Sequence, residues 1–289
     1  MTYKTKTIQR KIMKSLTLKL LTIALSVNTL FAGATEDKVL KFLSKSTTAT
    51  KSYKITDIRV ESSQNIPSMT GWKVYFIKID LDLVGKNKSI TISDKIFTDG
   101  KLVTKDLVDI NTAKSIKNSF VPDFRAEFYS DSNIIAGSKT APNKIAVFSD
   151  PLCPFCMSYM PDVINFVKKY PKQFTLYYYH FPLNIHPNSK TLIKAGLVAK
   201  KLGIKDVDLK MYDEAFDFGK KDEKLVLASV NKLLGTNIKL EELNQEDILK
   251  HMEDDKKIVD ALGLSGTPRV FVNGKIDPKR NTYFNLVKK

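Results

Sequence analysis

The stretch Phe148-Ser149-Asp150-Pro151-Leu152-Cys153-Pro154-Phe155-Cys156 decides how this chain folds, and it holds the only two cysteines of the 289 residues. The apolar run that leads into it, residues 145–148, is typical of a buried strand, and a helical pattern follows. Cys153 is therefore expected where a strand passes into a helix, with Cys156 one turn further along the same face. The free N–H groups and the dipole at a helix N-terminus should stabilise the thiolate of Cys153. This arrangement predicts thiol–disulfide exchange, in which an exposed Cys153 attacks and Cys156 resolves the mixed disulfide.

Three other interpretations of the cysteine pair compete with exchange chemistry. A zinc site needs a second pair or two histidines. The chain has no second pair, and its three histidines lack ligand-like spacing, although His180 and His186 could approach the cysteines in space. A purely structural disulfide would close too short a loop to constrain much chain entropy, and the cysteines could also be inert buried side chains. We favour exchange over these three and predict no metal site.

Residues 1–34 have the pattern of an export signal. A leader with six basic residues and no acidic one precedes a mostly apolar core, residues 20–31, which is short for a membrane span. Ala32-Gly33-Ala34 matches a small-residue cleavage site. An uncleaved anchor is the alternative, but the polar residues Ser26, Asn28 and Thr29 interrupt the core. Export to an oxidising compartment, the periplasm, suits a chain whose single cysteine pair has no competing cysteine.

The charge of the chain comes mainly from lysine. The formal net charge is +16, and the first 34 residues hold six of the basic residues and no acid, which leaves +10 for residues 35–289. Arginine, the preferred residue for specific phosphate contacts, occurs only five times. We therefore interpret the charge as a solvated lysine-rich surface and expect no nucleic-acid partner. Weak attraction to anionic surfaces or unfolded chains stays open.

Residues 35–110 are predicted to form a small α+β domain. A short helical pattern at residues 36–44 precedes the clearest alternation in the chain, where apolar and polar residues alternate over residues 77–83. Turn signals at residues 85–88 and 99–100 indicate an antiparallel sheet. The segment contains no cysteine or histidine. A sheet covered by one helix needs a partner surface, so we predict homodimerisation or client binding, with a passive spacer as the alternative.

Residues 111–143 are predicted to link two domains. Thr112 is placed to cap a short helix from Ala113 to Phe120. Residues 130–143 are rich in Ser, Gly, Asn and Pro, as domain boundaries often are.

The second domain is predicted to span residues 144–289. Its first strand and helix should be followed by a parallel strand at residues 174–179. Helical patterns then fill an insertion at about residues 186–262. Ser265-Gly266-Thr267-Pro268 leads into a last clear strand at residues 269–272.

Cys153-Pro154-Phe155-Cys156 at a strand-to-helix junction, with Gly266-Thr267-Pro268 before a late strand, resembles the thioredoxin superfamily. The helical insertion and the segment His180-Phe181-Pro182-Leu183 narrow the resemblance to the Dsb-type bacterial thiol:disulfide oxidoreductases. The separate N-terminal domain and the threonine before the proline are most similar to the dimeric DsbC/DsbG disulfide isomerases, whereas the oxidase DsbA usually has valine there. The chain departs from DsbC in lacking additional structural cysteines.

The resemblance implies a thioredoxin-like α/β catalytic domain with a helical insertion, preceded by a cystatin-like N-terminal domain. It implies that Cys153 is the attacking cysteine and Cys156 the resolving one. It further implies a cis Pro268 that faces the cysteines and, with Thr267, borders an extended substrate.

Neighbouring residues receive weaker assignments. Pro154 and Phe155 are expected to tune the redox potential and to present an apolar contact. Asp150 is expected either to modulate the thiols or to serve as a cap or turn residue. His180 is expected to be structural at a strand end, with a role near the thiols as the alternative.

The expected function is that of a periplasmic disulfide isomerase or reductase. Its clients would be unfolded or misoxidised exported proteins, and a membrane thiol reductase would keep it reduced. It would be a homodimer through residues 35–110, without a cofactor beyond the redox-active Cys153–Cys156 disulfide. Two alternatives remain: a DsbA-like oxidase served by a membrane thiol oxidase, and a holdase chaperone with secondary redox activity.

Overall fold

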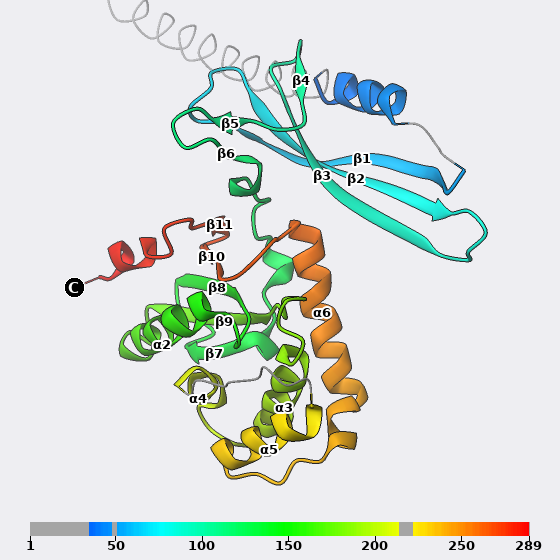
Figure 1. The fold of residues 1–289 in the computed structure, drawn as a ribbon. Coiled ribbons are helices and arrows are strands. Elements are labelled where there is room, and N and C mark those ends of the chain that lie inside the picture. The colour runs from blue at the N-terminus through cyan, green and yellow to red at the C-terminus, as the bar shows by residue number, and fades with distance from the viewer. Residues whose placement is uncertain (1–34, 48–50, 214–221, 289) are drawn as a thin grey trace, which may run out of the picture. The chain divides into compact units, whose positions relative to one another are not determined.

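The computed structural model describes residues 35–47, 51–213 and 222–288 (Figure 1). The export signal predicted for residues 1–34 lies outside the described residues. The chain divides into two compact units, residues 1–117 and 118–289. Within the described ranges, no helix combines the length and the apolar character needed to cross a membrane.

The first unit packs a helix of residues 35–46 on an antiparallel sheet (Figure 1). Val39 and Leu43 of the helix lie in one buried cluster with Tyr75, Ile77 and Ile96 of the sheet, so the apolar side of the helix covers one face. The helix and the half-buried strand predicted from the alternation are present. The strands run in the order β1 (Tyr53–Asn65), β2 (Lys73–Leu83), β3 (Ser89–Thr98) and β4 (Val103–Thr104).

The short helix predicted from Ala113 to Phe120 is wrong. The chain forms a hairpin of β5 (Val108–Asp109) and β6 (Lys114–Ser115), followed by the 3-10 turn η1 (Lys117–Ser119). The Asp109 carboxylate accepts hydrogen bonds from the backbone N–H of Thr112 at 2.8 Å and from its hydroxyl at 3.0 Å. Because Thr112 is held in this turn and Ala113 has a φ of 53°, no helix starts there.

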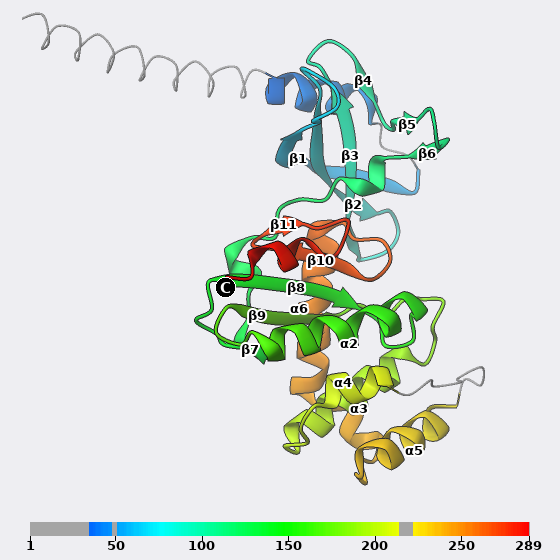
Figure 2. The same ribbon diagram turned by 90° about the vertical axis from the view of Figure 1, so that its left-hand side faces the viewer.

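The second unit is a five-stranded sheet with helices on both faces (Figure 2). The adjacent strands β8 and β9 are parallel and the other neighbours are antiparallel. Helix α2 (Pro154–Lys169) packs on one face and α6 (Glu246–Leu262) on the other. The strand order is β11 (Lys275–Ile276), β10 (Arg269–Val272), β8 (Asn143–Ser149), β9 (Phe174–His180) and β7 (Ile134–Gly137).

The predicted helical insertion lies between β9 and β10. It consists of α3 (Ser189–Lys201), α4 (Val207–Asp213), α5 (Glu223–Leu234) and the 3-10 helix η4 (Leu240–Asn244), followed by α6. Residues from α3, α4 and α5 form a buried cluster of their own, which explains the apolar stripes of this region. A 3-10 helix, η5 (Thr282–Leu286), follows β11 near the end of the described residues.

The linker predicted up to residue 143 is too long, because the second unit begins at residue 118. The ring of Phe124 lies 6.0 Å from that of Phe148 and 5.4 Å from that of Phe271, so this segment closes the core on the α6 face. Two 3-10 turns follow, η2 (Ala126–Phe128) and η3 (Asp131–Asn133), and then β7, which pairs with β9 as the edge strand of the sheet.

Candidate active site

Cys153 occupies the N-cap position of α2, as the sequence predicts. Its backbone N–H donates to the carbonyl of Asp150 at 3.0 Å, and its own carbonyl accepts from Cys156 and Met157 at 2.9 Å each. Pro154 takes the first helical position, where its missing N–H costs nothing. The side chain of Cys153 therefore starts beside the free N–H groups of the helix, which favour an anion.

The loop of residues 266–268 lies against the sulfur of Cys153. The Sγ atom donates to the carbonyl oxygen of Thr267 at 3.6 Å, and the Thr267–Pro268 bond is cis. Cys153 is only 4% exposed, so the expectation of an exposed sulfur is wrong. The loop encloses the residue, whereas the neighbouring Phe155 is 69% exposed.

Cys156 is fully buried behind Cys153. Burial raises the pKa of its thiol to about 11, and the nearby hydroxyls of Ser149 and Thr267 oppose the rise. The hydroxyl oxygen of Thr267 is buried and has no hydrogen-bond partner in the described structure. Both hydroxyls are thus placed to stabilise a thiolate at Cys156.

Asp150 anchors the loop before Cys153. Its carboxylate is completely buried and accepts four hydrogen bonds, two on each oxygen. Of the two roles considered for Asp150, the turn role agrees with this geometry, because the contacts tie the turn to residues 183–189. The partners are Leu152 N at 2.8 Å, Ser189 Oγ at 2.7 Å, Leu183 N at 2.7 Å and His186 Nδ1 at 2.9 Å.

His180 ends β9 and faces Asp255 of α6. The carboxylate of Asp255 accepts from the backbone N–H of His180 at 2.8 Å, lies 2.7 Å from its Nδ1 and accepts from Asn133 at 2.8 Å. His251 approaches the same carboxylate at 3.5 Å, and burial lowers the pKa of this imidazole. Ligand atoms of the two histidines and Asp255 lie within 4.8 Å of one another. Because the Asp255 carboxylate already accepts these hydrogen bonds, we interpret the cluster as a structural contact that joins β9 to α6.

Three buried hydroxyls next to Cys156 were missed by the sequence interpretation. Ser149 Oγ lies 2.6 Å from Tyr212 OH, which lies 2.7 Å from Tyr178 OH. Ser149 precedes Asp150 at the end of a buried strand, and a polar residue at such a position is a weak signal. Tyr212 gave no signal of this kind, because its contact joins residues 63 positions apart.

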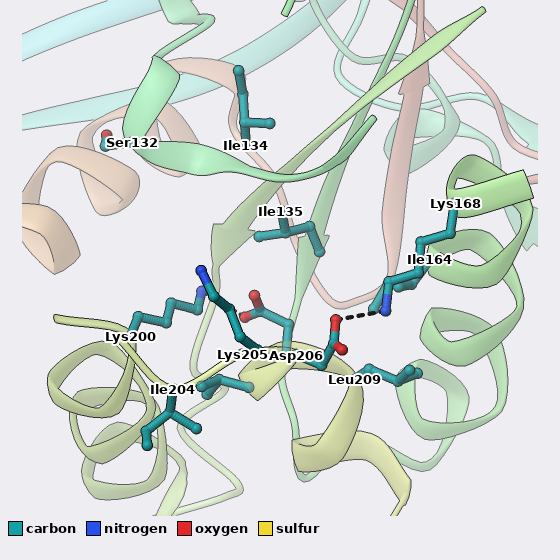
Figure 3. A pocket seen from close by; sticks show the side chains of 12 residues that line it. Ser132, Ile134, Ile135, Ile164, Lys168, Lys200, Ile204, Lys205, Asp206 and Leu209 are labelled. Atoms are coloured by element: carbon teal, nitrogen blue, oxygen red, sulfur yellow. Dashed lines mark hydrogen bonds and ion pairs between the residues drawn. The ribbon is translucent and has the colours of Figure 1, made fainter. Parts of the chain in front are cut away.

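A surface pocket of about 270 Å³ lies between α2, β7 and the α3–α4 region (Figure 3). Isoleucines form part of its wall, and no cysteine lines it. Of its three lysines, Lys168 and Lys200 pair at 2.6 Å with Asp206 and Asp208, and Lys205 is the third.

A family model described as thioredoxin matches residues 130–288, more than half of the chain. The chain belongs to the thioredoxin family. The thioredoxin-like α/β fold predicted for the C-terminal part is thereby confirmed. With the Cys-x-x-Cys pair at the start of α2, the protein is a thiol:disulfide oxidoreductase of this family.

Several solved structures match part of the chain at low identity. A thioredoxin-like oxidoreductase from Silicibacter pomeroyi is 21% identical with a TM-score of 0.44, covering 52% of this chain and 86% of that one. BdbD from Bacillus subtilis is 18% identical with a TM-score of 0.44, covering 57% and 92%. ScsC from Proteus mirabilis is 22% identical with a TM-score of 0.43, covering 55% and 72%. A search of curated proteins gives no match.

Proposed function

We propose that this thioredoxin-family protein is a disulfide isomerase or reductase that acts on exported proteins in the periplasm. The observation that carries the proposal is the placement of Cys153 at the N-terminus of α2, 3.6 Å from the carbonyl of Thr267, with Cys156 buried one turn behind. Phe155 offers a client an exposed apolar side chain beside the sulfur. Pro154 and Phe155 set the redox potential by shaping this turn.

The reaction begins with the thiolate of Cys153. It attacks one sulfur of a client disulfide, so that a Cys153–client disulfide forms and the other client sulfur leaves as a thiolate. That thiolate can attack another client disulfide or the mixed disulfide itself, which rearranges the client and returns Cys153.

Reduction of the client uses the second cysteine instead. Cys156 attacks the sulfur of Cys153, the client leaves with both sulfurs reduced, and a Cys153–Cys156 disulfide remains. A membrane thiol reductase would supply the two electrons that restore the dithiol. Thr267 and Pro268 border the client segment throughout, and the protein works as a homodimer through residues 35–110.

The proposal is tested with a client protein whose disulfides have been scrambled. The reduced protein should restore the client's activity, Cys153→Ala should abolish this effect, and Cys156→Ala should accumulate a mixed disulfide on Cys153. Thiol trapping in cells should find the pair mostly reduced. A protein that oxidises reduced clients, leaves scrambled ones inactive and rests as the disulfide would instead be an oxidase.

A further inference from the structure

Cys156 must give up its proton as it attacks the mixed disulfide, because the thiolate is the nucleophile. The residue is fully buried in the cluster that contains Val147, Met160 and Val270. The Asp150 carboxylate of the same loop is saturated by its four hydrogen bonds. The structure therefore places no free carboxylate of this loop at the Cys156 thiol, and the proton needs another route.

A chain of hydroxyl groups begins near Cys156 and leads away from it. The Ser149 hydroxyl is close enough to the Cys156 sulfur to lower the pKa of its thiol. It is followed by Tyr212 OH at 2.6 Å and Tyr178 OH at 2.7 Å, and in both contacts either oxygen can be the donor. Ser149 is 0%, Tyr178 3% and Tyr212 4% exposed, so the path runs through the interior. Hydroxyls that both accept and donate can pass a proton along such a path.

The far end of the path opens toward solvent. Tyr178 and Tyr212 line a small cavity of about 20 Å³, enough for one water molecule. Lys200, Val207 and Asp208 line both this cavity and the surface pocket of Figure 3. A proton that leaves Tyr178 thus reaches a site bordered by the Asp208 carboxylate, which is paired with Lys200 at 2.6 Å.

We propose that Ser149, Tyr212 and Tyr178 form a proton relay that carries the proton of Cys156 to the cavity beside Asp208, an inference that rests on the dithiol exchange proposed above. As Cys156 attacks Cys153, its S–H proton passes to Ser149 while Ser149 gives its own to Tyr212, Tyr212 to Tyr178, and Tyr178 to a water molecule in the cavity, which releases it to solvent. The S–S bond between Cys153 and the client breaks, and the client sulfur leaves with the electron pair. Each hydroxyl ends neutral.

The surroundings of the relay agree with a concerted transfer. Burial raises the pKa of both Tyr178 and Tyr212 well above that of free tyrosine, so neither is a resting tyrosinate. Among the described residues, the other titratable groups around the path are Cys153 and Asp150 at the α2 end, His180 stacked edge-on against the Tyr178 ring, Asp208 on α4 and Lys200 of α3 over the Tyr178 ring.

The experiment uses the reduced protein and one equivalent of a chromogenic aryl disulfide. Attack by Cys153 releases the first aryl thiolate, and resolution by Cys156 releases the second, so the two steps appear as separate phases. Cys156→Ser identifies the second phase by removing it. Tyr212→Phe interrupts the relay without touching Cys156. Tyr179→Phe is the matched control, because its buried hydroxyl donates at 2.7 Å to the carbonyl of Phe128 on the other face of the sheet.

We expect Tyr212→Phe to slow the second phase about 100-fold at neutral pH and to leave the first unchanged. The deficit should shrink as the pH rises toward about 11, where the Cys156 thiol ionises without the relay. Ser149→Ala should show the same pattern, whereas Tyr179→Phe should match the unmodified protein. Unchanged second phases in the Tyr212 and Ser149 variants, or equal slowing by Tyr179→Phe, would overturn the relay. Absence of the first phase in the unmodified protein would overturn the proposed function itself.

Discussion

At the scale of single residues, the active-site turn depends on one buried carboxylate. Asp150 is an acceptor for two backbone N–H groups, one hydroxyl and one imidazole, and it makes no contact with water. Such a group lowers the free energy of the fold only while every donor is matched, since an unmatched buried donor costs about 1–3 kcal/mol.

Asp150→Asn should therefore destabilise the protein by about 2–3 kcal/mol, because an amide NH₂ would face donors that now meet an oxygen. Urea unfolding measures the change. Asp254→Asn is the control, since the exposed pair of Asp254 with Lys250 should be worth about 0.5 kcal/mol or less. Equal losses of unfolding free energy in the two variants would show that the four hydrogen bonds of Asp150 stabilise the fold no more than an exposed ion pair does.

The contrast between the cysteines and the hydroxyls shows what the sequence can reveal at this scale. Cys153 and Cys156 were found because their chemistry depends on local spacing at one helix start. The contact between Ser149 and Tyr212 arises only when α4 docks on the sheet, and no spacing rule encodes it. The enclosure of Cys153 was missed for the same reason, since Thr267 lies 114 positions away.

At the scale of elements, the periodic segments were predicted and the short ones were not. The strands around residues 77–83 and 174–179 and the four long helices carry repeating apolar patterns. Strand β7 has only four residues and lies within residues 130–143, which are rich in Ser, Gly, Asn and Pro and were therefore predicted to be part of a linker. It belongs to the sheet because it pairs with β9, and the residues of β7 alone do not predict this pairing.

Gly137 at the end of β7 gives a test of that pairing. Its φ is +82°, and an added Cβ would overlap the carbonyl oxygen of Phe174 and lie 2.9 Å from Val167 Cγ1. Gly137→Ala should therefore cost more than about 3 kcal/mol, from backbone strain together with overpacking. Gly263→Ala is the matched control, with φ +58° and nothing within 4 Å, and should cost about 1–2 kcal/mol. Thermal unfolding of the two variants compares them, and equal shifts would refute the packing argument.

At the scale of the whole molecule, the first unit has two surfaces on which a second copy could dock. The edge strand β1 is 13 residues long, but two bulges interrupt it, and Arg59 bonds Asp57 at 2.8 Å and Glu61 at 3.0 Å along it. Bulges and charges are features that keep an edge from pairing. Exposed apolar side chains are found instead in residues 102–110, which we call the β4–β5 segment. They are Leu102, Val108 and Ile110, with exposed fractions of 65%, 61% and 93%.

We therefore expect the proposed homodimer to bury the β4–β5 segment. Sedimentation velocity should show a dimer for residues 35–289 and a monomer for the double variant Val108→Lys, Ile110→Lys, because two buried lysines without partners oppose association. Leu202→Lys alters a side chain of similar exposure, 57%, in the second unit and should leave the dimer intact. If the unmodified chain sediments as a monomer, the homodimer part of the proposed function is wrong. If the double variant still sediments as a dimer, the interface lies outside the β4–β5 segment. The proposed chemistry of Cys153 and Cys156 does not depend on either outcome, since the partners described above for the two cysteines belong to the second unit.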